Sequence, residues 1–151
     1  MSELIDFATR KHSVPVWFWI AALLGLAWNI FGVIQFVGSL SATQESLVAG
    51  GLSPEQASVM LGYPAWMTFA FAVGVFGGLI GCVLLLLKMR VSVQVFFGSL
   101  IGYVVLYVGD LTEGVFAAIG ISQVVILSIV VVIAAALFWL SRYFAQKGVL
   151  V

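Results

Sequence analysis

The chain has 151 residues, of which 64% are hydrophobic and only 8% are charged, and its formal net charge is zero. A soluble domain usually carries roughly a quarter of its residues as Asp, Glu, Lys or Arg. This composition leaves too little polar surface for an ordinary soluble protein, and the net charge gives no sign of a nucleic-acid partner.

Four windows of the chain contain no Lys, Arg, Asp, Glu or His, and each is about as long as a helix that crosses a bilayer. They cover residues 16–38, 65–87, 91–109 and 121–140. Residues 83–87 and 130–134 are apolar at every position, without the alternation of a β-barrel strand. We therefore predict an all-α integral membrane protein, a single domain over residues 1–151 that forms a four-helix transmembrane bundle.

The first window follows a short polar segment. Val14-Pro15 should end any local helix just before it, because the residue before proline disfavours the helical conformation. Arg10-Lys11 and the apolar run resemble a secretory signal, but 23 apolar residues exceed the usual ~7–15. We expect a retained helix.

Asn29 is the polar residue nearest the middle of this window. It shares a face with Gly25 and Gly32, with Gln35 toward the edge of that face and Trp28 next to it. An amide at that depth needs a partner, and such interhelical hydrogen bonds contribute roughly 0.6–2 kcal/mol. Asn29 either ties the first helix to a neighbour or contacts a ligand.

The connection over residues 39–64 carries two signals for helix starts. Ser41-x-x-Gln44 and Ser53-Pro54-Glu55-Gln56 both have the capping-box pattern, and the second has proline at the first helical position. Gly50-Gly51 should end the first short helix and Gly62 the second. We expect two short surface helices, with Tyr63 and Trp66 as interfacial anchors.

Small residues follow one face of the second window and part of the third. Small residues let helix backbones approach each other closely in lipid. We therefore expect these faces to be packing seams, that is, lines of contact with a neighbouring helix. The seams either close the bundle within one chain or join it to another chain. Cys82 is expected to be a small packing residue. The seam residues are Ala70, Gly74, Gly77, Gly78, Gly81, Gly98 and Gly102.

The third window presents a partly polar face. Its polar residues are Ser92, Ser99, Tyr103, Tyr107 and, at the end, Asp110. If this face meets that of the first window, the two enclose an aromatic-lined space that opens outward, with Trp66 at its rim. Such a space suits a neutral polar molecule, although a satisfied bundle interior is equally consistent. Asp110 is expected at the membrane interface, beside a solvated loop that contains Glu113.

The basic residues predict the orientation of the bundle. All six lie before the first window, between the second and third, or after the fourth. In the other two connections every charged residue is acidic. The positive-inside rule then places both termini and the Lys88-Met89-Arg90 turn in the cytoplasm, with a bacterial inner membrane as the expected location. The three-residue turn also makes the second and third helices antiparallel neighbours.

The sequence lacks the residues that several kinds of membrane and enzyme chemistry require. No window holds the buried acid, base or histidine that proton or cation coupling uses, and the single His12 cannot supply paired haem ligands. The sequence has no Cys or His cluster for zinc, no phosphate loop and no hydrolase motif. We expect no cofactor, no metal and no enzymatic activity.

Several segments resemble a family of small four-helix proteobacterial inner-membrane proteins, largely uncharacterised, some of which are labelled sugar transporters. These are Ala27-Trp28-Asn29, Tyr63-Pro64-Ala65-Trp66, residues 72–81 and Lys88-Met89-Arg90. Residues 61–65 are also distantly similar to DoxX-like four-helix proteins. The family often has a Gln-Met pair in the third helix, where this chain has Leu106-Tyr107.

Two functional hypotheses remain. The first is a non-enzymatic accessory or assembly subunit that packs against other membrane proteins, or against itself, through its glycine-rich faces. The second is a facilitator for a small neutral solute such as a sugar, in which Asn29, Gln35, Tyr103 and Tyr107 contact the solute.

Overall fold

The computed structural model describes residues 14–151, and all of its regular secondary structure is helical. Four helices are long and apolar enough to cross a membrane: α2 (Val16–Leu40), α5 (Ala65–Leu86), α6 (Ser92–Thr112) and α8 (Ile121–Gln146). Each begins within one residue of a predicted window, and α2 starts directly after Val14-Pro15 as expected. The basic pair Arg10-Lys11 lies outside the described residues.

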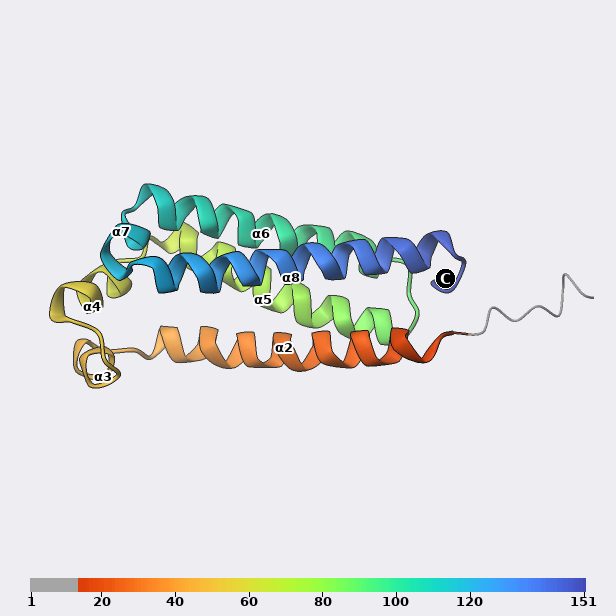
Figure 1. The fold of residues 1–151 in the computed structure, drawn as a ribbon, viewed down its shortest axis with the longest axis horizontal. Helices are drawn as coiled ribbons and strands as arrows, with labels where there is room; N and C mark the ends of the chain where they lie inside the picture. Colours follow the sequence, from red (N-terminus) through yellow and green to blue (C-terminus); the bar gives the residue numbers. More distant parts are fainter. Residues whose placement is uncertain (1–13) are drawn as a thin grey trace, which may run out of the picture.

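The four long helices lie side by side along the molecule (Figure 1). α5 packs against α2 and α6, and α6 packs against α8. The predicted antiparallel pairing of α5 with α6 is therefore confirmed. α2 packs mainly on α5, and the polar faces of the first and third helices meet only around a small cavity that Asn29, Ser99 and Tyr103 line.

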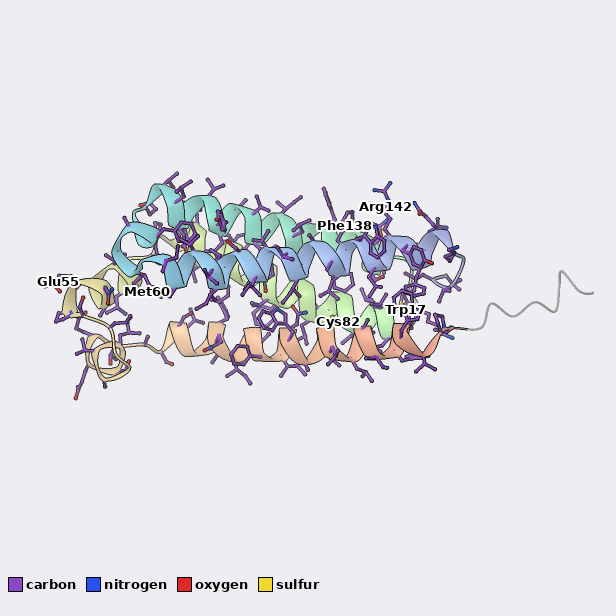
Figure 2. The ribbon with its side chains drawn as sticks, viewed as in Figure 1. Trp17, Glu55, Met60, Cys82, Phe138 and Arg142 are labelled. Atoms are coloured by element: carbon purple, nitrogen blue, oxygen red, sulfur yellow. The ribbon has the colours of Figure 1, made fainter. Side chains whose placement is uncertain are left out.

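The two ends of the bundle differ in charge. At the basic end lie the α5–α6 turn, with Lys88 and Arg90, and the C-terminal part of α8, which contains Arg142 and is followed by Lys147. At the acidic end lie three short helices, α3 (Gln44–Ala49), α4 (Pro54–Leu61) and α7 (Val115–Ile119). Figure 2 shows Arg142 and Glu55 at these opposite ends.

Capping residues explain where the short helices begin. Ser53 and Gln56 form the predicted capping box of α4, and Gly62 ends that helix. For α3 the predicted cap was wrong: Thr43 and Ser46 form its capping box. Ser41 instead ends α2, where its hydroxyl donates to the Val37 and Gly38 carbonyls over 3.4 and 3.2 Å. The sequence signals for α7 were not recognised.

The glycine seam of α5 is filled by neighbours in the same chain. A Cβ on Gly74 would lie 2.7 Å from the Tyr103 ring, and one on Gly102 would lie 2.9 Å from the Ala70 carbonyl oxygen. Gly77 and Gly81 abut Ser99 and Phe96 in the same way. These positions bring α5 and α6 into backbone contact, whereas Gly98 faces open space.

Three clusters of buried side chains form the core, one above another along the bundle. The cluster at the basic end unites all four long helices, from Phe18 on α2 to Phe144 on α8. A middle cluster joins Phe36, Val75, Tyr103 and Ala134. The cluster at the acidic end contains α5, α6, α7 and α8 residues but none from α2. The outer end of α2 therefore contributes nothing to this cluster, and Phe36 in the middle cluster is the outermost buried residue of α2.

Candidate functional site

A small cavity lies between the four long helices, near the middle of the bundle. Its volume is about 10 Å³, counted as the space open to the centre of a water molecule, which is about enough for one water. Three of its lining residues are polar, and each was a predicted site residue: Asn29, Ser99 and Tyr103. The others are Trp28, Gly78, Phe96, Val130, Ile133, Ala134 and Leu137.

Asn29 reaches this cavity from α2 and is only 3% exposed. Its Nδ2 donates to the Gly25 carbonyl over 2.8 Å and to the Cys82 sulfur over 3.6 Å. Both amide hydrogens therefore have acceptors, and Oδ1 remains as an acceptor at the wall formed by Gly78. A Cβ on Gly78 would lie 1.9 Å from that oxygen, so only glycine admits the amide there.

Ser99 and Tyr103 line the cavity from α6, one helical turn apart. The Ser99 hydroxyl donates to the Gly74 carbonyl over 2.6 Å, which leaves its oxygen free to accept. The Tyr103 ring covers Gly74, and its hydroxyl lies 4.0 Å from the position of a Cβ on Gly32 of α2. Tyr103 is 4% exposed.

The remaining predicted site residues lie elsewhere. Gln35 is exposed on α2, and Trp66 is 46% exposed near the acidic end, against Gly109. The Tyr107 hydroxyl is 3.4 Å from that of Ser128, and its ring packs on Phe116. None of these three lines this cavity, and Trp66 does not lie at its rim.

Asp110 was expected at the membrane interface rather than in the core, and its burial contradicts this expectation. The α6 helix continues to Thr112, and the Asp110 side chain is fully buried beneath the short helices of the acidic end. Its carboxylate accepts hydrogen bonds from the Tyr63 hydroxyl over 2.6 Å and from Gln123 Nε2 over 3.0 Å. The long helices do contain a buried acid, and it is held by two neutral donors.

Helix ends help to explain how this carboxylate is buried. Gln123 lies in the first turn of α8 and Tyr63 just before the start of α5. Helix N-termini carry partial positive charge, which favours an anion nearby. Burial, the hydrogen bond to Asp110 and the negative charge of that carboxylate raise the pKa of the Tyr63 phenol well above its ordinary value.

Within residues 14–151 no three His, Cys, Asp or Glu side chains are grouped so that they could hold a metal ion. The Cys82 thiol is fully buried beside Asn29 (Figure 2). No distinctive motif marks the α8 wall of the cavity or the partners of Asp110, because these are apolar residues, a glutamine and a loop tyrosine.

The chain was compared with known protein families, sequences and structures. Neither a protein-family model, nor a curated protein sequence, nor a solved structure matches this chain.

Proposed function

We propose that this protein is a non-enzymatic, multi-pass membrane protein that acts as an accessory or assembly subunit, packing against another membrane protein. In this proposal the contact is made by one face of α2, because the glycine seams are already filled by α5 and α6 of the same chain. That α2 face consists of Ile20, Leu24, Ala27, Phe31, Ile34, Gln35 and Gly38, all exposed and on one side of the helix.

The observation that carries the proposal is Gln35. Its amide is exposed on an otherwise apolar face, and no hydrogen bond joins it to the rest of residues 14–151. A primary amide in hydrocarbon is costly unless another polar group pairs with it, so a partner helix with an amide or hydroxyl at that depth would stabilise it. Gly38, which has open space around it, would let that helix approach closely.

The weak attachment of α2 supports the same face. The buried residues of α2 form a single stripe, Phe18, Ala22, Gly25, Asn29 and Phe36. The opposite face of α2 is largely uncovered: Leu24, Phe31 and Ile34 are 66%, 51% and 62% exposed. A long helix with one face uncovered has room for a neighbour on that face.

Photo-crosslinking in native membranes tests this proposal. A photoreactive residue at Ile34 should give one discrete adduct with another membrane protein. The same residue at Ile101, which is 47% exposed on α6, is the matched control and should give diffuse or no adducts. Gln35→Leu should lower the yield of the Ile34 adduct several-fold. Equal adducts from both sites, or a chain that purifies only as a homo-oligomer, would contradict an accessory role.

The sequence also suggested a facilitator for a small neutral solute, and the presence of Asn29, Ser99 and Tyr103 around one cavity keeps it as a second candidate. A cavity of about 10 Å³ is far smaller than the several hundred Å³ of a typical ligand pocket, so a sugar would need a more open conformation. In proteoliposomes, a facilitator should show sugar uptake that Asn29→Leu abolishes. Uptake equal to that of empty vesicles would rule this candidate out.

A further inference from the structure

One face of α8 changes from apolar to aromatic to basic as it approaches the basic end of the bundle. Its residues lie three or four apart along the helix and therefore on one side of it: Ile129, Val132, Ala136, Trp139, Tyr143 and Lys147. Tyr143 is half-buried, and the other five are exposed. The order of these residues matches a phospholipid in a bilayer, whose apolar acyl chain leads through an ester region to a charged phosphate.

The aromatic part of this face is held in place by contacts between two helices. The Tyr143 ring stacks on that of Trp139, with ring centres 5.5 Å apart and an angle of 22° between the ring planes. The ring of Trp17, from α2, lies 6.2 Å from that of Tyr143 and 4.8 Å from that of the buried Phe144. Lys147 Nζ lies over the Tyr143 ring, 5.5 Å from its centre. The ammonium group is thus placed beside aromatic side chains that can themselves donate hydrogen bonds.

We propose that this face of α8, with Trp17 beside it, binds one anionic phospholipid from the leaflet at the basic end. Lys147 pairs with the lipid phosphate, the aromatic residues contact the glycerol and ester groups, and an acyl chain lies along the apolar residues. From Trp139 to Ile129 the helix rises about 15 Å, which is half of the ~30 Å hydrocarbon core of a bilayer. The apolar part of the face is therefore as long as one leaflet is deep.

Charge favours an anionic lipid over a zwitterionic one. Among residues 14–151 all four basic residues lie at this end of the bundle, and all four acidic residues lie at the other end. Within that part of the chain no carboxylate competes with a lipid phosphate for Lys147. One basic residue near a membrane surface strengthens the binding of anionic lipid about fivefold.

The lipid site rests on the membrane location proposed above but not on an accessory role. The α2 face proposed to meet a partner does not include Trp17, and the other residues of the lipid site belong to α8. A chain that stayed soluble without detergent would contradict the membrane location itself, before any lipid is added. A failed crosslink from Ile34 would leave the lipid site unaffected.

Native mass spectrometry of the full chain, purified in a mild detergent, tests the site. We expect each chain to retain one phosphatidylglycerol molecule, and to retain phosphatidylcholine with the same acyl chains several-fold less. Lys147→Gln should lower the retention of phosphatidylglycerol about fivefold. Arg142→Gln is the matched control and should leave the retention nearly unchanged. It removes the same charge from α8, but Arg142 lies about 140° around the helix from Lys147 and on the side away from Trp17 (Figure 2).

Three results would overturn the proposal: no retained lipid, equal retention of the two lipids, or equal losses in the two variants, which would indicate a diffuse attraction to the basic end. Both substitutions replace exposed side chains, so neither should prevent folding. Phosphatidylglycerol with a photoreactive group in its acyl chain provides a second measurement. It should crosslink to residues 129–136 of α8, and crosslinks to α5 or α6 alone would contradict the placement of the acyl chain.

Discussion

Asn29 illustrates how one polar residue depends on a glycine from another helix. Its amide fits between α2 and α5 only because Gly78 has no side chain. The same amide then bonds to the Gly25 carbonyl and the Cys82 sulfur, so it fixes the depth of α2 against α5. A hydropathy profile shows Asn29 only as a polar interruption of an apolar helix. In the structure its side chain forms a packing contact between α2 and α5.

We expect Gly78→Ala to destabilise the bundle by about 1–3 kcal/mol, because the added methyl group would overlap Asn29 and force α2 away from α5. Thermal or denaturant unfolding of the purified chain in detergent measures the effect. Gly98→Ala is the matched control, since its methyl group would enter open space. Equal stability of the two variants would show that Asn29 does not pack against Gly78 as described.

Asp110 and Tyr63 give a prediction about pH. The pKa of Tyr63 lies above its ordinary value of about 10, so its neutral form is favoured in the folded state. The resulting stabilisation is fully present below pH 10 and is lost as the pH rises above the pKa of the unfolded chain. We expect the phenolate absorbance assigned by Tyr63→Phe to appear only at pH values well above 10.

Removing the carboxylate charge should shift that titration. In Asp110→Asn the pKa of Tyr63 should fall toward its ordinary value, because a neutral side chain no longer repels the phenolate. Glu113→Gln is the control, since Glu113 is exposed nearby in sequence. Identical titrations of wild type and Asp110→Asn would contradict the contact between Asp110 and Tyr63.

At the scale of the elements, the segment after α8 closes the basic end of the bundle. The Arg90 amide donates to the Val151 carbonyl, and the Val151 amide donates to the Lys88 carbonyl, each over 2.8 Å. Between these bonds and α8, Leu150 is 3% exposed and belongs to the same core cluster as Phe18. The α5–α6 turn and this segment therefore hold each other in place.

Leu150→Ala should destabilise the protein by about 2–5 kcal/mol, because it leaves a cavity in the cluster at the basic end. Val151→Ala is the matched control, since that side chain is 94% exposed. Unfolding of both variants in the same detergent provides the measurement. If both unfold like the wild type, the segment does not pack against the core in solution.

At the scale of the whole molecule, the proposed orientation can be tested with its exposed ends. We expect Glu55→Cys, at the acidic end, to react with a membrane-impermeant maleimide added to intact spheroplasts. Lys147→Cys, at the basic end, should react only after the membrane is opened, because the positive-inside rule places that end in the cytoplasm. The wild type provides the background, since Cys82 is fully buried. The reverse labelling pattern would invert the proposed topology.

The four long helices can be predicted from the amino-acid sequence, because apolar runs and the need to satisfy backbone hydrogen bonds are local properties. The sequence also determines the start of α4, through the Ser53 capping box, and the pairing of α5 with α6 across a short turn. The small residues on one face of α5 are also evident from the sequence. Which neighbouring side chains pack against them is not.

The remaining features follow from the packing of whole helices, because contacts between distant segments have no local cause. Asn29, Ser99 and Tyr103 share a cavity since α5, with Gly74 and Gly78, lets both α2 and α6 come close. Gln35 and Tyr107 follow the same helical pattern, yet neither lines the cavity. Asp110 is buried because Tyr63 and Gln123, 47 and 13 residues away, supply its donors. No local signal in the sequence indicates such pairings.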